Sequence, residues 1–351
     1  MPAAGSAGAD PLAIALLALS WAGVSAYLLL AGADFGGGLW DLLAGGSRRG
    51  ARQRALIEHS VGPVWEANHV WLIFVLVLVW TAFPPLFAAV SSTLYIPLTL
   101  VALGVIARGA AFAFRKAVTE LWQRRLFGAA FAFSSVVTPF FLGAAGGAIA
   151  SGRVPPGIAT GNPLTSWWNP TSALAGAFTV GCCAYLAAVY LTADAQREGQ
   201  AELAEAFRRR GLVSGTIVGA LAVVGLLVAR TDAPLLFGRL VGVALPLVGV
   251  SLAAGVASLL LLALRRFTLV RITAALAVAA VLWGWGLAQY PDLLLPGLTV
   301  AQAAAPRATL LATAISVAVG LALLVPSLAW LFVLFQRPRS DQASDAPAGR
   351  V

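Results

Sequence analysis

Residues 62–85 read GPVWEANHVWLIFVLVLVWTAFPP, and this stretch decides the fold class. Its apolar part is long enough for a helix that crosses a bilayer, which needs roughly 20 apolar residues. Glu66, Asn68 and His69 stand in its first turns. A carboxylate in hydrocarbon is costly unless it is paired, solvated or protonated. The stretch therefore predicts a membrane helix, and Glu66 suggests a role in proton or ion transfer.

The composition of the 351-residue chain extends this interpretation to the whole protein. Hydrophobic residues make up 60% and charged residues 11%, whereas a soluble domain carries about 25% charged residues. The apolar stretches are long, unlike the short alternating segments of a membrane barrel. We therefore predict an all-α integral membrane protein in contact with the lipid bilayer. The net charge of +9 does not indicate nucleic-acid binding, because the basic residues lie in loops between apolar spans.

About nine transmembrane helices are predicted from the apolar segments. The first four and the next four have matching polarity, which suggests two four-helix bundles related by a repeat, plus one extra helix. We expect a single polytopic membrane domain over residues 1–335 and a disordered, cytoplasmic tail over 336–351, which is polar and contains proline. The segments lie near 11–33, 61–83, 86–112, 127–150, 172–193, 212–229, 240–263, 268–289 and 308–335.

The basic residues predict the direction of these spans. Of the 23 Lys and Arg residues, only Arg153, Arg230, Arg239 and Arg307 fall on one side of the nine-span arrangement. Loops rich in Lys and Arg stay in the cytoplasm. We therefore expect the N-terminus outside and the C-terminus in the cytoplasm.

Asp34 ends the first predicted span and is followed by Phe35 and three glycines. Glycines let a chain turn sharply and let another backbone come close, so we expect the helix to end in a turn here. Two interpretations of Asp34 stay open. It is either a solvated residue of a helix C-terminal turn or an acid at the mouth of a proton path.

A second set of ionisable residues follows at helical spacing. Glu58, Gly62 and Glu66 are four residues apart and share one helix face, and His69 lies close to that face. Such a ladder could pass protons inward from the cytoplasmic surface. The alternative is that Glu66 simply pairs with an arginine of a neighbouring helix, such as Arg108, and the two interpretations can coexist.

The histidine count argues against a haem in this chain. Only His59 and His69 exist, and the sole methionine is Met1. Bis-His or His/Met pairs usually hold a b-type haem, and two histidines ten residues apart point in different directions from one helix. No Cys/His/carboxylate cluster has metal-ligand spacing, so we predict no metal site. If the chain belongs to a redox enzyme, the redox centres lie on another subunit.

Together, these motifs resemble subunit II of the cytochrome bd quinol oxidases. Residues 32–38, GADFGGG, are similar to that family's Gly-Phe-Asp-x-Gly-x-Gly motif, and residues 63–72 match its Pro-x-Trp-Asp/Glu-x-Asn-x-x-Trp-Leu motif. Phe83-Pro84 and the segment 108–115, rich in arginine and aromatic residues, also fit. The rest of the chain agrees in length, span number and orientation only.

The chain departs from the family pattern at three positions. Ala31 and Ala33 stand where some members carry an acid and an aromatic residue, and Glu66 stands where many carry Asp. If the family's proton route uses a chain of acids, this protein has one link fewer. Waters or Glu58 would then have to complete the route.

The resemblance implies a quinol:oxygen oxidoreductase of aerobic respiration, a heterodimer in the bacterial cytoplasmic (inner) membrane. A haem-bearing subunit I would hold haem b and haem d, oxidise quinol, and reduce dioxygen to water with protons from the cytoplasm. The present chain would carry no haem, would support that partner, and could contribute to proton uptake. A quinone bound between its helices and small accessory membrane subunits are further options.

The resemblance also assigns roles by motif position. The proton-path candidates are Asp34 and Glu66, with Glu58 and His69 as weaker ones. Three further residues could shape that path or contact the partner subunit, namely Trp65, Asn68 and Arg108.

Two other functions remain open at this level. A proton-coupled secondary transporter would also contain buried acids, a repeat, and membrane glycines and prolines. A passive assembly scaffold of the same oxidase would use Glu66 for structure alone.

Overall fold

The computed structural model describes residues 8–45, 50–61, 65–115 and 120–336. Within these ranges the chain is helical except for loops and one antiparallel hairpin, β1 (Asp292–Leu294) and β2 (Leu298–Thr299). The helices are α1 (Pro11–Leu42), α2 (Ala51–Val61), α3 (Trp65–Ala82), α4 (Pro84–Thr93), α5 (Tyr95–Arg115), α6 (Leu121–Ala150), α7 (Pro170–Arg197), α8 (Ala201–Asp232), α9 (Pro234–Leu240), α10 (Leu245–Ala263), α11 (Phe267–Gln289), α12 (Val300–Ala303) and α13 (Arg307–Gln336).

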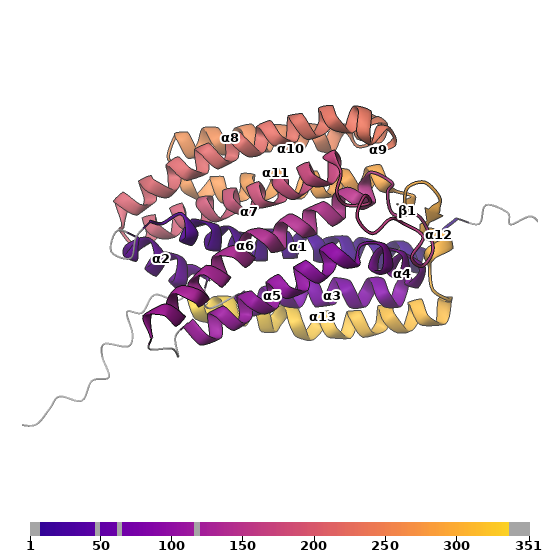
Figure 1. The fold of residues 1–351 in the computed structure, drawn as a ribbon, viewed down its shortest axis with the longest axis horizontal. Coiled ribbons are helices and arrows are strands. Elements are labelled where there is room, and N and C mark those ends of the chain that lie inside the picture. The colour runs from indigo at the N-terminus through magenta and orange to yellow at the C-terminus, as the bar shows by residue number, and fades with distance from the viewer. Residues whose placement is uncertain (1–7, 46–49, 62–64, 116–119, 337–351) are drawn as a thin grey trace, which may run out of the picture.

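The long helices run side by side along one axis of the molecule (Figure 1). In the described chain, seven are long and apolar enough to cross a membrane, namely α1, α6, α7, α8, α10, α11 and α13. The bent pair α3 and α4 makes an eighth if it is counted as one span, and the apolar part of α5, Tyr95–Ala111, is shorter. The predicted all-helical, multi-pass membrane protein is confirmed, while the number nine stays a prediction.

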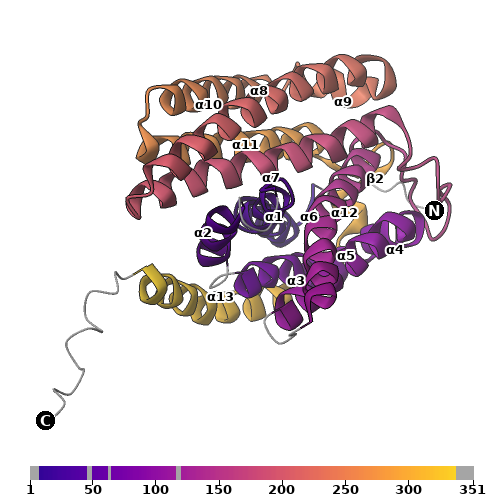
Figure 2. The ribbon, with the colours of Figure 1, turned by 60° about the vertical axis from the view of Figure 1, so that its left-hand side comes forward.

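Helix contacts form two groups. In the first, α1 packs against α3 and α6, and α5 packs against α6. In the second, α7 contacts α8 and α11, and α10 contacts α8 and α11. The two groups meet where α7 packs against α1 and α6, and α13 lies at the edge beside α3 (Figure 2). The sequence repeat stays a prediction, and residues 337–351 of the predicted tail lie outside the described chain.

The first helix does not turn at Asp34, so that expectation was wrong. It begins at Pro11, where the Asp10 side chain caps the Leu12 amide at 2.9 Å, and it continues through the three glycines to Leu42. Inside a membrane the backbone has to satisfy its own hydrogen bonds, which favours continuing the helix. The glycines serve close packing instead, because a Cβ on Gly36 would lie 1.9 Å from a backbone oxygen of α7.

The third predicted span also has different bounds. The segment 86–112 is divided, because α4 ends at Thr93 and α5 begins at Tyr95. The axes of α3 and α4 differ by 117°. Proline has no amide hydrogen and cannot continue a helix, but it fits the first turn of a new one. Pro84 and Pro85 therefore end α3 and start α4.

Ion pairs tie together the end of the molecule where α9 and β1 lie (Figure 1). Arg153 contacts Asp232 at 2.6 Å, and Arg239 contacts Asp292 at 2.8 Å. Arg307 lies 4.0 Å from Asp10, so three of the four arginines predicted for the outer side have an ion-pair partner. The direction of the chain across the membrane stays a prediction.

Candidate functional site

A buried polar cluster lies where α1, α3, α5 and α6 meet. Three of its members were predicted site residues: Asp34 is 6% exposed, Asn68 is 2% exposed and Arg108 is 1% exposed. The Asn68 side-chain amide donates a hydrogen bond of 2.5 Å to Oδ2 of Asp34. Asp34 is therefore not the solvated residue of a helix end, because it faces the interior of the helix bundle.

Arg108 connects three helices at this cluster. Its Nη2 donates to the backbone carbonyl oxygen of Asp34 at 2.8 Å, and its Nη1 donates to Oγ of Ser135 on α6. A buried cation is costly unless an opposite charge and hydrogen bonds compensate for its lost hydration. The charges of Asp34 and Arg108 therefore stabilise each other, although the arginine binds the aspartate through its backbone.

Two aromatic rings also contact the guanidinium. Cζ of Arg108 lies 4.3 Å from the ring centroid of Phe131 and 4.9 Å from that of Phe35. A cation over an aromatic face is attracted by the ring's quadrupole, and more strongly where water is excluded. These contacts help to hold Arg108 in one position between α1 and α6.

A glycine makes room for this arrangement. A Cβ placed on Gly38 would lie 2.0 Å from Oγ of Ser135 and 3.1 Å from Nη1 of Arg108. Any larger residue at this position would displace the serine or the arginine. The glycine run after Asp34 therefore contributes to the site by its lack of side chains, and not by forming a turn.

His69 extends the cluster along α3. Its Nδ1 lies 3.4 Å from the hydroxyl oxygen of Tyr27, and its ring lies 6.1 Å from that of Phe35, measured between centroids. Tyr27 and Phe35 also pack edge to face, with 6.4 Å between ring centroids. The imidazole thus contacts Tyr27 and Phe35 of α1, and His69 directly follows Asn68 on α3.

Glu58 lies on α2 and is exposed, so it is a surface group. The neighbouring His59 is also exposed, and its Nε2 lies 3.7 Å from the carboxylate of Glu198. The predicted ladder passes through Gly62, which lies outside the described residues. The same holds for the side chains of Glu66 and Trp65, so their predicted roles stay predictions.

Three members of the cluster were missed in the sequence, namely Tyr27, Phe131 and Ser135. Ser135 gave no distinctive signal, because a serine inside an apolar helix commonly bonds to its own backbone. Both Ser134 and Ser135 do so, donating to the carbonyl of Phe131 at 2.9 and 2.6 Å. Only the tertiary structure separates the two, since Ser135 alone also contacts Arg108.

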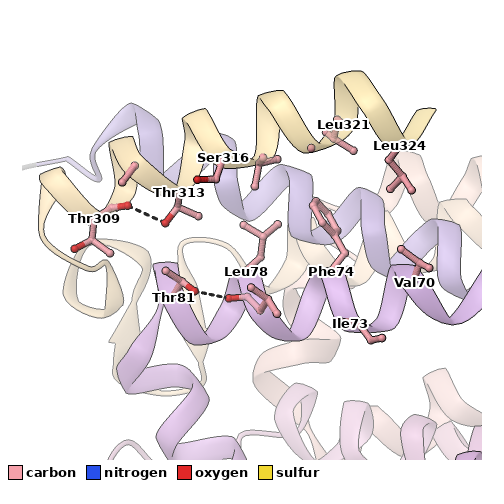
Figure 3. Close-up of a pocket in the computed structure, with 14 residues that line it drawn as sticks. Val70, Ile73, Phe74, Leu78, Thr81, Thr309, Thr313, Ser316, Leu321 and Leu324 are labelled. Atoms are coloured by element: carbon pink, nitrogen blue, oxygen red, sulfur yellow. Dashed lines mark hydrogen bonds between the residues drawn. The ribbon is translucent and has the colours of Figure 1, made fainter. Parts of the chain in front are cut away.

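A second feature is an apolar groove between α3 and α13, with a volume of about 710 Å³ (Figure 3). Its walls are mainly aliphatic, and hydroxyl groups of α3 and α13 face it toward one end, at Thr81, Thr309 and Thr313. Two of these hydroxyls already donate to carbonyls of their own helix, Thr81 to Val77 at 2.7 Å and Thr313 to Thr309 at 2.8 Å. The groove therefore favours an apolar occupant.

Metal binding is not supported in the part of the chain that the structure describes, where no three His, Cys, Asp or Glu side chains converge. Cys182 and Cys183 are free and buried in α7. The chemistry that the polar cluster offers is proton exchange at a carboxyl group.

Comparison with known proteins agrees with this architecture. The chain is 34% identical over 117 residues to the cytochrome bd ubiquinol oxidase subunit 2 of Bacillus subtilis, which covers 33% of this chain and 34% of that protein. It is 30% identical over 167 residues to the cytochrome bd-I ubiquinol oxidase subunit 2 of Escherichia coli K12, covering 46% of this chain and 43% of that protein. The matched segments thus span less than half the length of these relatives.

The fold is similar to that of a chain in the bd oxidase structure from Geobacillus thermodenitrificans. The TM-score is 0.71 at 23% sequence identity, over 93% of this chain and 99% of that chain. The family model described as cytochrome bd terminal oxidase subunit II matches residues 12–335. Because this match spans nearly the whole chain, the protein belongs to the cytochrome bd terminal oxidase subunit II family.

Proposed function

We propose that this chain is the haem-free subunit II of a complex that oxidises quinol and reduces dioxygen to water. Membership of the family supports this function. A haem-bearing subunit I would be the partner in a heterodimer and would hold haem b and haem d. The complex would work in the bacterial cytoplasmic membrane, with the N-terminus of this chain outside.

Within that complex, we assign proton uptake to the cluster around Asp34. The observation that carries this assignment is the geometry of the buried acid: its carboxylate accepts from Asn68, while Arg108 binds its backbone carbonyl. The carboxyl group can therefore gain or lose a proton without breaking the hydrogen bonds that hold the arginine. Because the guanidinium binds the backbone carbonyl and not the carboxylate, a proton that arrives at Asp34 can be passed on.

The remaining candidates extend this path toward the cytoplasm. Glu66 precedes Asn68 by two residues on α3, and Glu58 is an exposed acid on α2. We propose that protons enter near Glu58 and pass Glu66 and His69 before they reach Asp34. Trp65 would shape this route or pack against the partner subunit.

The groove between α3 and α13 is the candidate position for a bound quinone. It is about 710 Å³ in volume and mainly apolar, which suits an isoprenoid tail. Measuring the quinone content of the complex after Val77→Trp, which fills the groove, tests this assignment. Small accessory subunits would reveal themselves as further polypeptides in the same preparation.

The function is tested by affinity purification through this chain in mild detergent, followed by a reduced-minus-oxidised visible spectrum. We expect haem b and haem d bands together with a second large membrane polypeptide. A colourless eluate with a single polypeptide, from membranes that contain these haems, would remove the oxidase function. A proton-coupled transporter would then become the leading alternative.

A further inference from the structure

Ser135 of α6 lies beside Arg108 in the Asp34 cluster. It is 1% exposed, and its hydroxyl donates to the carbonyl of Phe131 at 2.6 Å. A hydroxyl has one hydrogen to donate and lone pairs to accept with. Because its hydrogen is directed to Phe131, Ser135 presents a lone pair to Nη1 of Arg108, which donates to it.

One face of α6 therefore holds the guanidinium in two ways. Ser135 accepts its hydrogen bond, and the ring of Phe131, four residues earlier, lies 4.3 Å from Cζ of Arg108. Residues four apart share a helix face, so both contacts come from the same side. Asp34 and Phe35 of α1 also contact the guanidinium.

The close approach of α1 and α6 depends on Gly38. A Cβ at this position would lie 2.0 Å from Oγ and 2.5 Å from Cβ of Ser135. The serine thus fits against the glycine backbone, and Arg108 reaches both helices from α5.

We infer that Ser135, set against Gly38, is a positioning residue that directs Arg108 to the backbone of Asp34 and so keeps the aspartate carboxylate free to exchange protons. Without the Ser135 acceptor, the buried guanidinium would lose one hydrogen bond and could turn from the backbone of Asp34 to its carboxylate. A direct ion pair would hold Asp34 ionised and slow proton transfer. This inference rests on the proposed role of Asp34 in proton uptake.

The test compares Ser135→Ala with Ser134→Ala in the purified complex. Ser134 is a matched control, because it is 2% exposed and also donates to the carbonyl of Phe131, but it does not contact Arg108.

We expect Ser135→Ala to keep its haem content and lose oxygen turnover about tenfold, since a misplacement of about 1 Å can cost about 100-fold in rate. The loss should grow as the pH rises and the supply of protons falls, and the solvent isotope effect on turnover should increase. Ser134→Ala should change neither quantity.

Gly38→Ala tests the position of Ser135 with a change on α1. Its Cβ displaces Ser135, so it should reproduce the pH dependence of Ser135→Ala, and the double variant should be no slower than the slower single one. If Gly38→Ala does not assemble, the two serine variants still decide the question. Equal turnover of Ser135→Ala and Ser134→Ala would overturn the inference, as would loss of haem from Ser135→Ala.

Asp34→Asn distinguishes failure of the proposed proton uptake from failure of the role of Ser135. Full turnover of Asp34→Asn would contradict proton uptake at Asp34. Slow turnover of Asp34→Asn together with equal turnover of the two serine variants would contradict only the role of Ser135.

Discussion

Asn68 donates a hydrogen bond of 2.5 Å to the carboxylate of Asp34, although the two residues are 34 positions apart and lie on different helices. Both side chains are buried. An amide donates a hydrogen bond to a carboxylate without adding charge. The pair therefore fixes the position of one ionisable carboxyl group between α1 and α3.

We expect Asp34→Asn to lower oxygen turnover about 100-fold while haem content is kept, because general acid–base groups contribute about 100-fold or more. The exchanged double variant, Asp34→Asn with Asn68→Asp, restores one acid and one amide at the same contact. It should recover part of the turnover, since the proton-carrying group moves by only one hydrogen bond. Oxygen electrode traces and haem spectra of the three complexes measure this. A double variant as slow as the single one would show that the position on α1 is essential, and an active single variant would contradict the proton role.

Arg108 should matter more for assembly than for the chemistry of proton transfer. Removing one partner of a buried charge pair costs about 3–5 kcal/mol, so Arg108→Ala should reduce the yield and thermal stability of the complex. Arg108→Lys should rescue only part of this loss, because an ammonium cannot reproduce the two directed hydrogen bonds and the ring contacts of the guanidinium. Thermal denaturation of the purified complex measures both effects, and Arg271→Ala, which removes an arginine near a single ring of Tyr190, is the control. Equal melting temperatures for Arg108→Ala and the control would contradict this account.

The sequence identified part of the site because polar residues are rare in apolar spans. Asp34, Asn68 and Arg108 were all candidates on this ground, and the structure places them together. The turn after Asp34 was wrong, since a glycine run is compatible with a chain reversal and with close helix packing alike. Only the position of Cys183 and Ser135 beside the glycines decides between them. Ser135 could not be distinguished from Ser134, because their difference depends on which of them faces α5.

The break between α3 and α4 could also be predicted only in part from the sequence. Prolines at 84 and 85 predicted the end of one helix. Their effect on direction, a bend of 117°, depends on how α4 packs at the end of the bundle. Local chemistry therefore identified where the helix stops, whereas the start of the next span at Tyr95 required the tertiary structure.

Close packing of α1 against α7 predicts a strong effect of Gly36→Ala. The new Cβ would lie 1.9 Å from the carbonyl oxygen of Cys183 and 2.7 Å from Cβ of Ala187. A backbone atom cannot rotate away, so the helices must separate, and overpacking of this kind costs about 1–3 kcal/mol. Gly219→Ala on α8 is the control, because its Cβ meets nothing within 4 Å. We expect a lower melting temperature for the first variant and an unchanged or slightly raised one for the second. Equal melting temperatures would show that α1 and α7 are not packed as closely as described.

The proposed role of Glu66 in the proton path is based on the sequence motif. Two substitutions at this position test it. Glu66→Gln keeps the size of the side chain and removes its charge, so oxygen turnover should fall while haem content stays. Glu66→Asp keeps the acid and should be tolerated, with a turnover within about threefold of the native complex, a difference of roughly 0.7 kcal/mol in the barrier. Full activity of Glu66→Gln with normal assembly would show that the proton role is wrong. Loss of haem together with activity would assign Glu66 to structure alone.

The direction of the chain across the membrane can be tested by cysteine labelling. Both native cysteines are buried, at 1% and 2% exposure, so they give little background. Ile158 lies in the loop between α6 and α7 and is 75% exposed, while Gln196 is exposed at the end of α7 where the basic residues predominate. Because loops rich in arginine stay in the cytoplasm, a membrane-impermeant maleimide should label Ile158→Cys in intact cells. It should label Gln196→Cys only after the cells are opened. The opposite pattern would invert the proposed topology and place the exposed acid Glu58 on the outer side, where it could not receive protons from the cytoplasm.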